Sequence, residues 1–218
     1  MYRPRDLVSG DFYWAAQMGA WKLFTVADCT GHGVPGAFMS MLGISLLNEL
    51  IREYHTVNTA DLLKILFVRL SQNMHRKTGM DTVPDSMDIV FCAWNNVTNE
   101  LQYSGINIPL YLVRNKELHT LKPTRMLNAS EMVQNQYIDI KTVQLQKGDL
   151  LILSSDGYVD QFGGEKGKKF KRQNFRNLLV SLSDYPIDEQ QKKIEFTFLK
   201  WKGTQNQIDD VCVMGIKI

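Results

Sequence analysis

The chain has 218 residues, of which 44% are hydrophobic and 22% are charged. This composition is typical of a globular protein and excludes a disordered, collagen-like or low-complexity chain. Lysine and arginine number 25 against 23 acidic residues, for a net charge of +2, so charge gives no case for nucleic acid as the main partner. Charged or amide residues interrupt the apolar stretches, so we expect no membrane span.

In chain order, the first predicted elements are strands at residues 11–18 and 21–28, separated by a glycine turn. Helices follow at about 34–54 and 59–77, where apolar residues recur at helical spacing. Further strands are predicted at 87–94, 100–104, 110–114, directly after 115–116, at 137–145 and at 150–154, with a polar connection at 121–136. Helices at 173–184 and 188–202 and a strand at 211–218 complete the chain. This order predicts a single α+β domain over residues 1–218.

The cysteines indicate a reducing compartment. Cys29, Cys92 and Cys212 are odd in number, widely spaced and outside any CxxC motif. A disulfide framework or a structural zinc site is therefore not expected, and reduced thiols fit best.

Aspartates stand where predicted strands begin or end. Asp11 opens a strand, Asp28 closes one, Asp156 follows the apolar strand 150–154, and Asp209 and Asp210 precede the last strand. Each of them has an ordinary alternative role as a turn or cap residue. If the strand ends converge, however, the carboxylates would repel one another and require a cation. Oxygen-only ligands favour Mg²⁺ or Mn²⁺ over zinc.

Four ordered segments carry a family resemblance: Arg3–Tyr13, Ala27–Gly36, Ser155–Gly157 and Asp209–Val211. Together they resemble the SpoIIE/RsbU-type serine phosphatases, the bacterial branch of the metal-dependent PP2C-like protein phosphatases. Residues 105–111, 160–164 and 167–170 also look like this branch, so the resemblance covers nearly the whole chain. It implies a β-sandwich of two mainly antiparallel sheets flanked by pairs of helices, with two Mn²⁺ or Mg²⁺ ions at one end.

The resemblance also implies roles for individual residues. Asp28 matches the aspartate that bridges both metals, and the carbonyl of Cys29 takes the place of a glycine carbonyl that ligates one ion. Asp156 and Asp209 match the other metal carboxylates, and Asp11 matches the aspartate of the first motif. The position of Asp210 is often Asn or Asp in relatives. The implied reaction is direct hydrolysis of a phosphoester by a metal-bridging water.

Three further residues are candidates for a functional role, and two of them also have a structural interpretation. His32 is a candidate to protonate the leaving oxygen, because histidine side chains in general exchange protons near neutral pH, or it shapes the turn before the helix. Arg5 is a candidate phosphate ligand, or one of a surface pair on an edge strand. Gly157 is small enough to let phosphate approach the metals.

Two charged features each allow two interpretations. Asp88 lies inside an apolar strand, where a charge is unusual, and either supports the metal site or binds a backbone group. The basic run around Lys166–Lys169, with Lys171 and Arg172, is either a solvated loop or a contact for an acidic protein substrate.

The predicted function is a protein serine/threonine phosphatase acting on a small regulatory phosphoprotein of the anti-sigma factor antagonist type. The alternatives are an inactive PP2C-like interaction domain and a metal-dependent nucleotide or phosphodiester hydrolase. We expect a cytoplasmic, C-terminal catalytic part of a longer protein with an upstream sensor domain, and we leave a homodimer and upstream membrane attachment open. By analogy with relatives, helices 34–77 are expected to move during activation.

Overall fold

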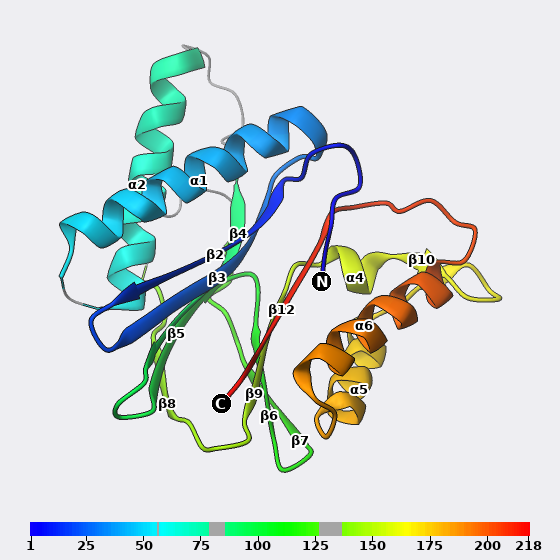
Figure 1. The fold of residues 1–218 in the computed structure, drawn as a ribbon. Helices are drawn as coiled ribbons and strands as arrows, with labels where there is room; N and C mark the ends of the chain where they lie inside the picture. Colours follow the sequence, from blue (N-terminus) through cyan, green and yellow to red (C-terminus); the bar gives the residue numbers. More distant parts are fainter. Residues whose placement is uncertain (56, 79–85, 127–136) are drawn as a thin grey trace.

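The computed structural model describes residues 1–55, 57–78, 86–126 and 137–218, and its main feature is a pair of five-stranded antiparallel sheets packed face to face (Figure 1). The first sheet has the order β2-β3-β4-β5-β8, with β2 (Asp11–Met18), β3 (Trp21–Cys29), β4 (Met87–Asn95), β5 (Glu100–Ile106) and β8 (Lys141–Gln144). The second has the order β1-β12-β9-β6-β7, with β1 (Tyr2–Arg3), β12 (Val211–Lys217), β9 (Leu150–Ser154), β6 (Leu110–Arg114) and β7 (Glu117–Leu121).

Helices cover the outer faces of both sheets. The helices α1 (Gly33–Glu53) and α2 (Thr59–Thr78) lie on the first sheet, and α5 (Arg172–Leu182) and α6 (Ile187–Lys202) lie on the second (Figure 1). One helical turn, α4 (Gly157–Asp160), and a small hairpin, β10 (Phe162–Gly163) and β11 (Lys168–Lys169), connect β9 to α5. The predicted α+β sandwich with flanking helix pairs is confirmed.

The sandwich explains why its central strands read as unbroken apolar runs. In β9, Leu151 and Leu153 point into the space between the sheets, whereas Leu150 and Ile152 pack against α5 and α6. All four side chains are at most 1% exposed. Because successive side chains of a strand alternate between its faces, a strand buried on both faces must be apolar throughout.

Helix α1 departs from one expectation drawn from the sequence. By length and composition alone it is apolar enough to cross a membrane, whereas the sequence pattern predicted no membrane span. In the fold, Leu46, Leu47 and Leu50 of α1 are buried in the cluster between the first sheet and its helices. A helix that packs in a protein core can match a membrane span in length and hydropathy.

The predicted and observed elements differ mainly where the elements are short. The predicted strand at 137–145 is regular only over Lys141–Gln144, and the two-residue strands and α4 were not predicted. The predicted polar connection lies in part outside the described residues. Elements of two to four residues show too few repeats for a period to be recognised.

Candidate active site

Strand pairing in the first sheet gathers three aspartates at one edge. Asp11 begins β2 and lies opposite Asp28 near the end of β3, and Asp28 in turn lies opposite Asp88 near the start of β4. Antiparallel neighbours place the start of one strand beside the end of the next. The side chain of Asp11 is only 2% exposed, whereas Asp28 and Asp88 are half-buried.

The second sheet brings the other aspartates to the same end of the sandwich. Asp156 follows β9 and Asp209 precedes β12, and these two strands are antiparallel neighbours. Ser155 joins the two sheets, because its hydroxyl donates to Oδ2 of Asp11 over 2.5 Å and accepts from the Cys212 N–H over 2.9 Å. The structure therefore brings Asp11, Asp28, Asp156 and Asp209 close enough to affect one another's ionisation.

The carboxyls of Asp11 and Asp28 resist ionisation. Burial, followed by the charges of Asp210, Asp209 and Asp156, raises the pKa of Asp11 to about 7 even though Ser155 donates to it. Burial and the charge of Asp11 likewise raise the pKa of Asp28 well above its usual value. Both shifts have the direction expected for carboxyls that share a site without a cation.

The two aspartates from the second sheet shift in the same direction. Partial desolvation in the cleft and the charge of Asp209 raise the pKa of Asp156, and the charge of Arg172 opposes this shift. Desolvation also raises the pKa of Asp209, against a hydrogen bond from the Asp210 N–H. The two sheets thus contribute to one acidic cluster.

Asp210 differs from its neighbours because both of its carboxylate oxygens are engaged. Oδ1 accepts the N–H of Arg5 and Oδ2 accepts the N–H of Gly10, each over 2.7 Å. Asp210 is 2% exposed. These bonds hold the segment that leads into β2, so the geometry gives Asp210 an anchoring role beneath the cluster.

Asp88 is fixed by a residue that the sequence did not single out. The Asn107 amide donates to Oδ1 of Asp88 over 2.8 Å, and the same side chain exchanges two hydrogen bonds of 3.0 Å with the main chain of Met126. Burial raises the pKa of Asp88, while Asn107 and the charges of Arg125 and Arg172 oppose the shift. Asp88 therefore lines the site with a carboxylate that Asn107 orients.

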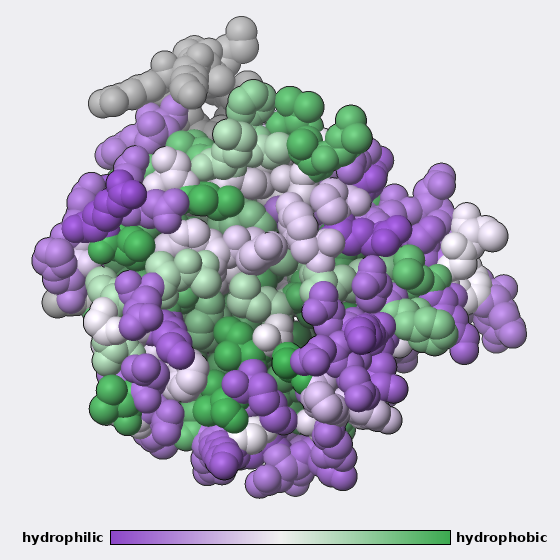
Figure 2. All heavy atoms as spheres, in the orientation of Figure 1, coloured by the Kyte–Doolittle hydropathy of each residue, from purple (hydrophilic) through white to green (hydrophobic). Residues whose placement is uncertain are grey.

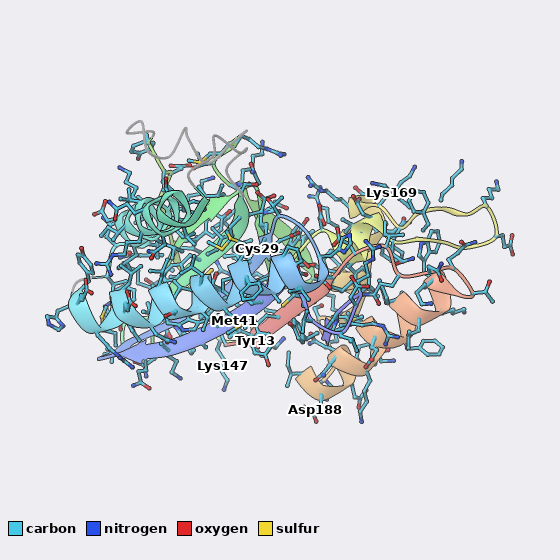
Figure 3. The ribbon with its side chains drawn as sticks, turned by 90° about the horizontal axis from the view of Figure 1, so that it is seen from above. Tyr13, Cys29, Met41, Lys147, Lys169 and Asp188 are labelled. Carbon is cyan, nitrogen blue, oxygen red and sulfur yellow. The ribbon has the colours of Figure 1, made fainter. Side chains whose placement is uncertain are left out.

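Cys29 and Gly157 lie at the site in different ways. Cys29 is buried with its thiol in the core between β3 and α1 (Figure 3). A Cβ added at Gly10 would stand 3.1 Å from the carbonyl oxygen of Cys29. Gly157 is buried, and a Cβ there would lie 1.9 Å from the carbonyl oxygen of Asp210. The structure thus explains Gly157 by close backbone approach.

His32 and Arg5 lie on the exposed rim of the site. Nδ1 of His32 is 3.1 Å from Oδ2 of Asp6, and both side chains are nearly half exposed. The Arg5 guanidinium donates to the carbonyl of Ile208 over 3.1 Å. Both residues therefore already have partners within the N-terminal segment and the loop before β12.

A small cleft opens beside the cluster. Its walls include Asp28, Asp88 and Asp156 together with Asn107, Tyr111 and Arg172. A wider groove of about 420 Å³ lies elsewhere, between β12 and α6, and Figure 2 shows apolar residues gathered near the middle of this face. We place the candidate site at the small cleft, because Asp28, Asp88 and Asp156 line it.

The donor set fits hard divalent cations. Its side chains offer carboxylate oxygens, which Mg²⁺ and Mn²⁺ prefer, and no imidazole or thiolate joins them in the cleft lining. Among the described residues, no three acidic, histidine or cysteine side chains form a preassembled metal cluster. Carboxylates repel one another, so neighbouring carboxylates are expected to stay apart when no cation lies between them.

The family match agrees with this geometry. The model of the family described as Stage II sporulation protein E (SpoIIE) matches residues 22–218, so the chain belongs to this family of PP2C-type phosphatase domains. Comparison with curated protein sequences gives no match.

Solved structures show the same fold. The SiaA-PP2C domain of Pseudomonas aeruginosa is 28% identical, with a TM-score of 0.88 over 100% of this chain and 84% of that one. The PP2C phosphatase domain of SpoIIE from Bacillus subtilis, solved with a fragment of its regulatory domain, is 16% identical with a TM-score of 0.78, over 100% and 61%. The RsbU and RsbW domains of Rv1364c from Mycobacterium tuberculosis are 21% identical, with a TM-score of 0.76 over 99% of this chain and 58% of that one.

Proposed function

We propose that this chain is a metal-dependent protein serine/threonine phosphatase that hydrolyses phosphoserine or phosphothreonine in a regulatory phosphoprotein. The observation that carries the proposal is the acidic cluster, in which carboxyls from both sheets share one end of the sandwich with raised pKa values. A chain gains nothing in stability from such a cluster, so a bound cation is its natural explanation.

Four carboxylates would hold two Mn²⁺ or Mg²⁺ ions: Asp11, Asp28, Asp156 and Asp209, with the carbonyl of Cys29 as a further oxygen donor. When bound, the ions activate water for in-line attack and polarise the phosphoryl group. The strand register places Asp28 between Asp11 and Asp88. This central position supports the role that the family resemblance implies for Asp28, which would be a ligand shared by both ions.

The remaining residues position these ligands. Ser155 orients Asp11 through its hydroxyl, and Asn107 orients Asp88. Asp210 ties down the backbone at Arg5 and Gly10, which fixes the start of β2. Loss of such supporting hydrogen bonds typically weakens metal binding or activity about 10- to 100-fold.

The kind of substrate rests on family analogy. One similar structure contains RsbU and RsbW domains together, and another contains a regulatory fragment beside its phosphatase domain. These support a phosphoprotein of the anti-sigma factor antagonist type as substrate and an upstream sensor domain as regulator. Fold similarity does not fix partners, so both belong to the proposal.

The test is hydrolysis of a phosphoserine peptide in Mn²⁺ by the wild type and by Asp28→Ala. We expect a loss of about 1,000-fold or more in kcat, since the substitution removes the central ligand. A matched control, Asp61→Ala on the exposed first turn of α2, should keep full activity. Equal rates in wild type and Asp28→Ala would contradict the proposal. Faster turnover of nucleotides or phosphodiesters than of the phosphoserine peptide would mean that the substrate is not a phosphoprotein.

A further inference from the structure

Arg172 lines the cleft without being one of the proposed metal ligands or the residues that orient them. It is the first residue of α5, and it lines the same small cleft as Asp28, Asp88 and Asp156. Its guanidinium is close enough to oppose the upward pKa shifts of Asp88 and Asp156. An arginine beside three carboxylates would ordinarily pair with one of them.

Arg172 instead keeps its charge available. The side chain is exposed. Arg69, Arg114 and several lysines form salt bridges within the described residues, but Arg172 forms none there. Arg5, the arginine expected from the sequence to bind phosphate, already donates to the Ile208 carbonyl. Of these two arginines, Arg172 is the one that lines the cleft, and its side chain has no hydrogen bond or ion pair to another described residue.

The backbone beneath Arg172 is held firmly. The preceding residue, Lys171, has φ 75° and ψ 147°, and its N–H donates to the Val159 carbonyl over 2.7 Å. Phe175, one turn later, is fully buried and lines the same cleft. The guanidinium therefore projects from a fixed base, which lowers the entropy lost when it binds a ligand.

The start of α5 adds to the positive field. The helix has 11 residues and no acidic residue in its first turn, and no side chain caps its N-terminus. The helix dipole therefore favours an anion near Arg172. A phosphate monoester presents oxygens that match the planar fork of a guanidinium.

We propose that Arg172 binds the phosphoryl oxygens of the substrate, opposite the carboxylate side of the cleft, and that it replaces Arg5 in this role. The proposal rests on the phosphatase function proposed above. It makes Arg172 a residue that distinguishes phosphate monoesters by charge. A monoester dianion gains more from it than a phosphodiester, which carries a single negative charge.

The experiment compares Arg172→Gln and Arg172→Lys with Arg176→Gln, a matched control one turn along α5 that does not line the cleft. Kinetics with p-nitrophenyl phosphate in Mn²⁺ should show kcat/KM reduced about 10- to 100-fold in Arg172→Gln, mostly through KM, because a charged hydrogen bond is lost. Arg172→Lys should recover part of this loss, and Arg176→Gln should match the wild type.

A binding readout separates this proposal from the phosphatase function. Inorganic phosphate should bind the Mn²⁺-loaded wild type in calorimetry and bind Arg172→Gln at least about 10-fold more weakly. Unchanged phosphate affinity and unchanged KM in Arg172→Gln would overturn the role of Arg172 even if the wild type is an active phosphatase. An inactive wild type that still binds phosphate through Arg172 would overturn only the proposed reaction. Equal losses of phosphate affinity in Arg176→Gln would mean a general charge effect and would overturn the role of Arg172.

Discussion

Two buried aspartates of this chain, Asp149 and Asp11, shift their pKa values in opposite directions. Both are at most 2% exposed. Asp149 precedes β9 and accepts two hydrogen bonds from the Arg114 guanidinium, over 2.8 and 2.6 Å, and one from the Gln146 N–H over 2.8 Å. Burial alone would raise the pKa of Asp149, but Arg114 and Gln146 bring it below its usual value.

Asp11 has a comparable degree of burial but no cationic partner among the residues that the structure describes. Its partners are the Ser155 hydroxyl and other carboxylates, so its pKa rises to about 7. The comparison teaches that burial alone does not mark a functional aspartate. Asp149 forms a satisfied structural ion pair with Arg114, whereas Asp11 belongs to a cluster of carboxyls that a cation would neutralise under the proposed function.

The largest expected effect on folding lies on the structural side of this comparison. Asp149→Asn should lower the free energy of unfolding by about 3 kcal/mol, because it leaves the Arg114 guanidinium without its charged partner. Urea denaturation measures this value. Phosphatase activity per folded molecule should remain, because Asp149 lies outside the cleft lining.

Asp28→Asn is the matched control on the functional side. In the metal-free protein it should leave stability unchanged or raise it, since it removes a carboxyl whose ionisation the site opposes. A loss of stability comparable to that of Asp149→Asn would erase the distinction between the two aspartates.

The dependence of stability on pH sharpens the same comparison. An unfolded aspartate ionises near pH 4, whereas Asp11 in the folded state holds its proton up to about pH 7. The folded state therefore binds more protons between these values, and the metal-free protein should lose about 1 kcal/mol per pH unit between pH 5 and 7. Denaturation in EDTA at both pH values checks this.

Asp11→Asn should reduce this slope, whereas Asp149→Asn should leave it in place. The depressed pKa of Asp149 confines its own effect to more acidic solutions, where its stabilising contribution is lost as the pH falls through the folded pKa. An identical slope in Asp11→Asn and wild type would show that another group titrates.

A smaller effect is expected from backbone strain at the rim of the functional cleft. Lys171 adopts φ 75° and ψ 147°, a region that glycine occupies far more readily. Lys171→Gly should stabilise the fold by about 1 kcal/mol, because strain relief exceeds the added entropy of the unfolded chain.

The control for this substitution is Lys168→Gly, at a neighbouring exposed lysine in β11 that lacks a positive φ. It should be neutral or slightly destabilising. If thermal denaturation showed both glycine variants destabilised equally, Lys171 would carry no strain.

Much of the fold and the outline of the site could be predicted from the sequence. Continuous apolar strands such as β9 and periodic helices such as α5 carry strong local signals. Aspartates at strand ends are also visible locally, and antiparallel pairing then decides which ends meet. The sequence marks Asp11, Asp28, Asp156 and Asp209 as strand-end aspartates, and their proposed metal roles follow from the family resemblance. The structure places them close enough to affect one another's pKa values.

The supporting residues could not be predicted in the same way. Ser155 acts on Asp11 across 144 positions, and Asn107 on Asp88 across 19. Serine and asparagine are common in loops, so their type alone carries no signal of such a contact. The anchoring bonds of Asp210 also depend on the path of the N-terminal segment, which the sequence does not specify.

The central claim is that the acidic cluster binds divalent cations, and calorimetric titration of Mn²⁺ into the metal-free protein tests it most directly. We predict two ions bound per chain in the wild type and in Asp149→Asn. In Asp28→Asn we predict that at least one ion binds about 10-fold or more weakly, because the central ligand loses its charge. No binding by the wild type, or identical binding by Asp28→Asn, would contradict the account.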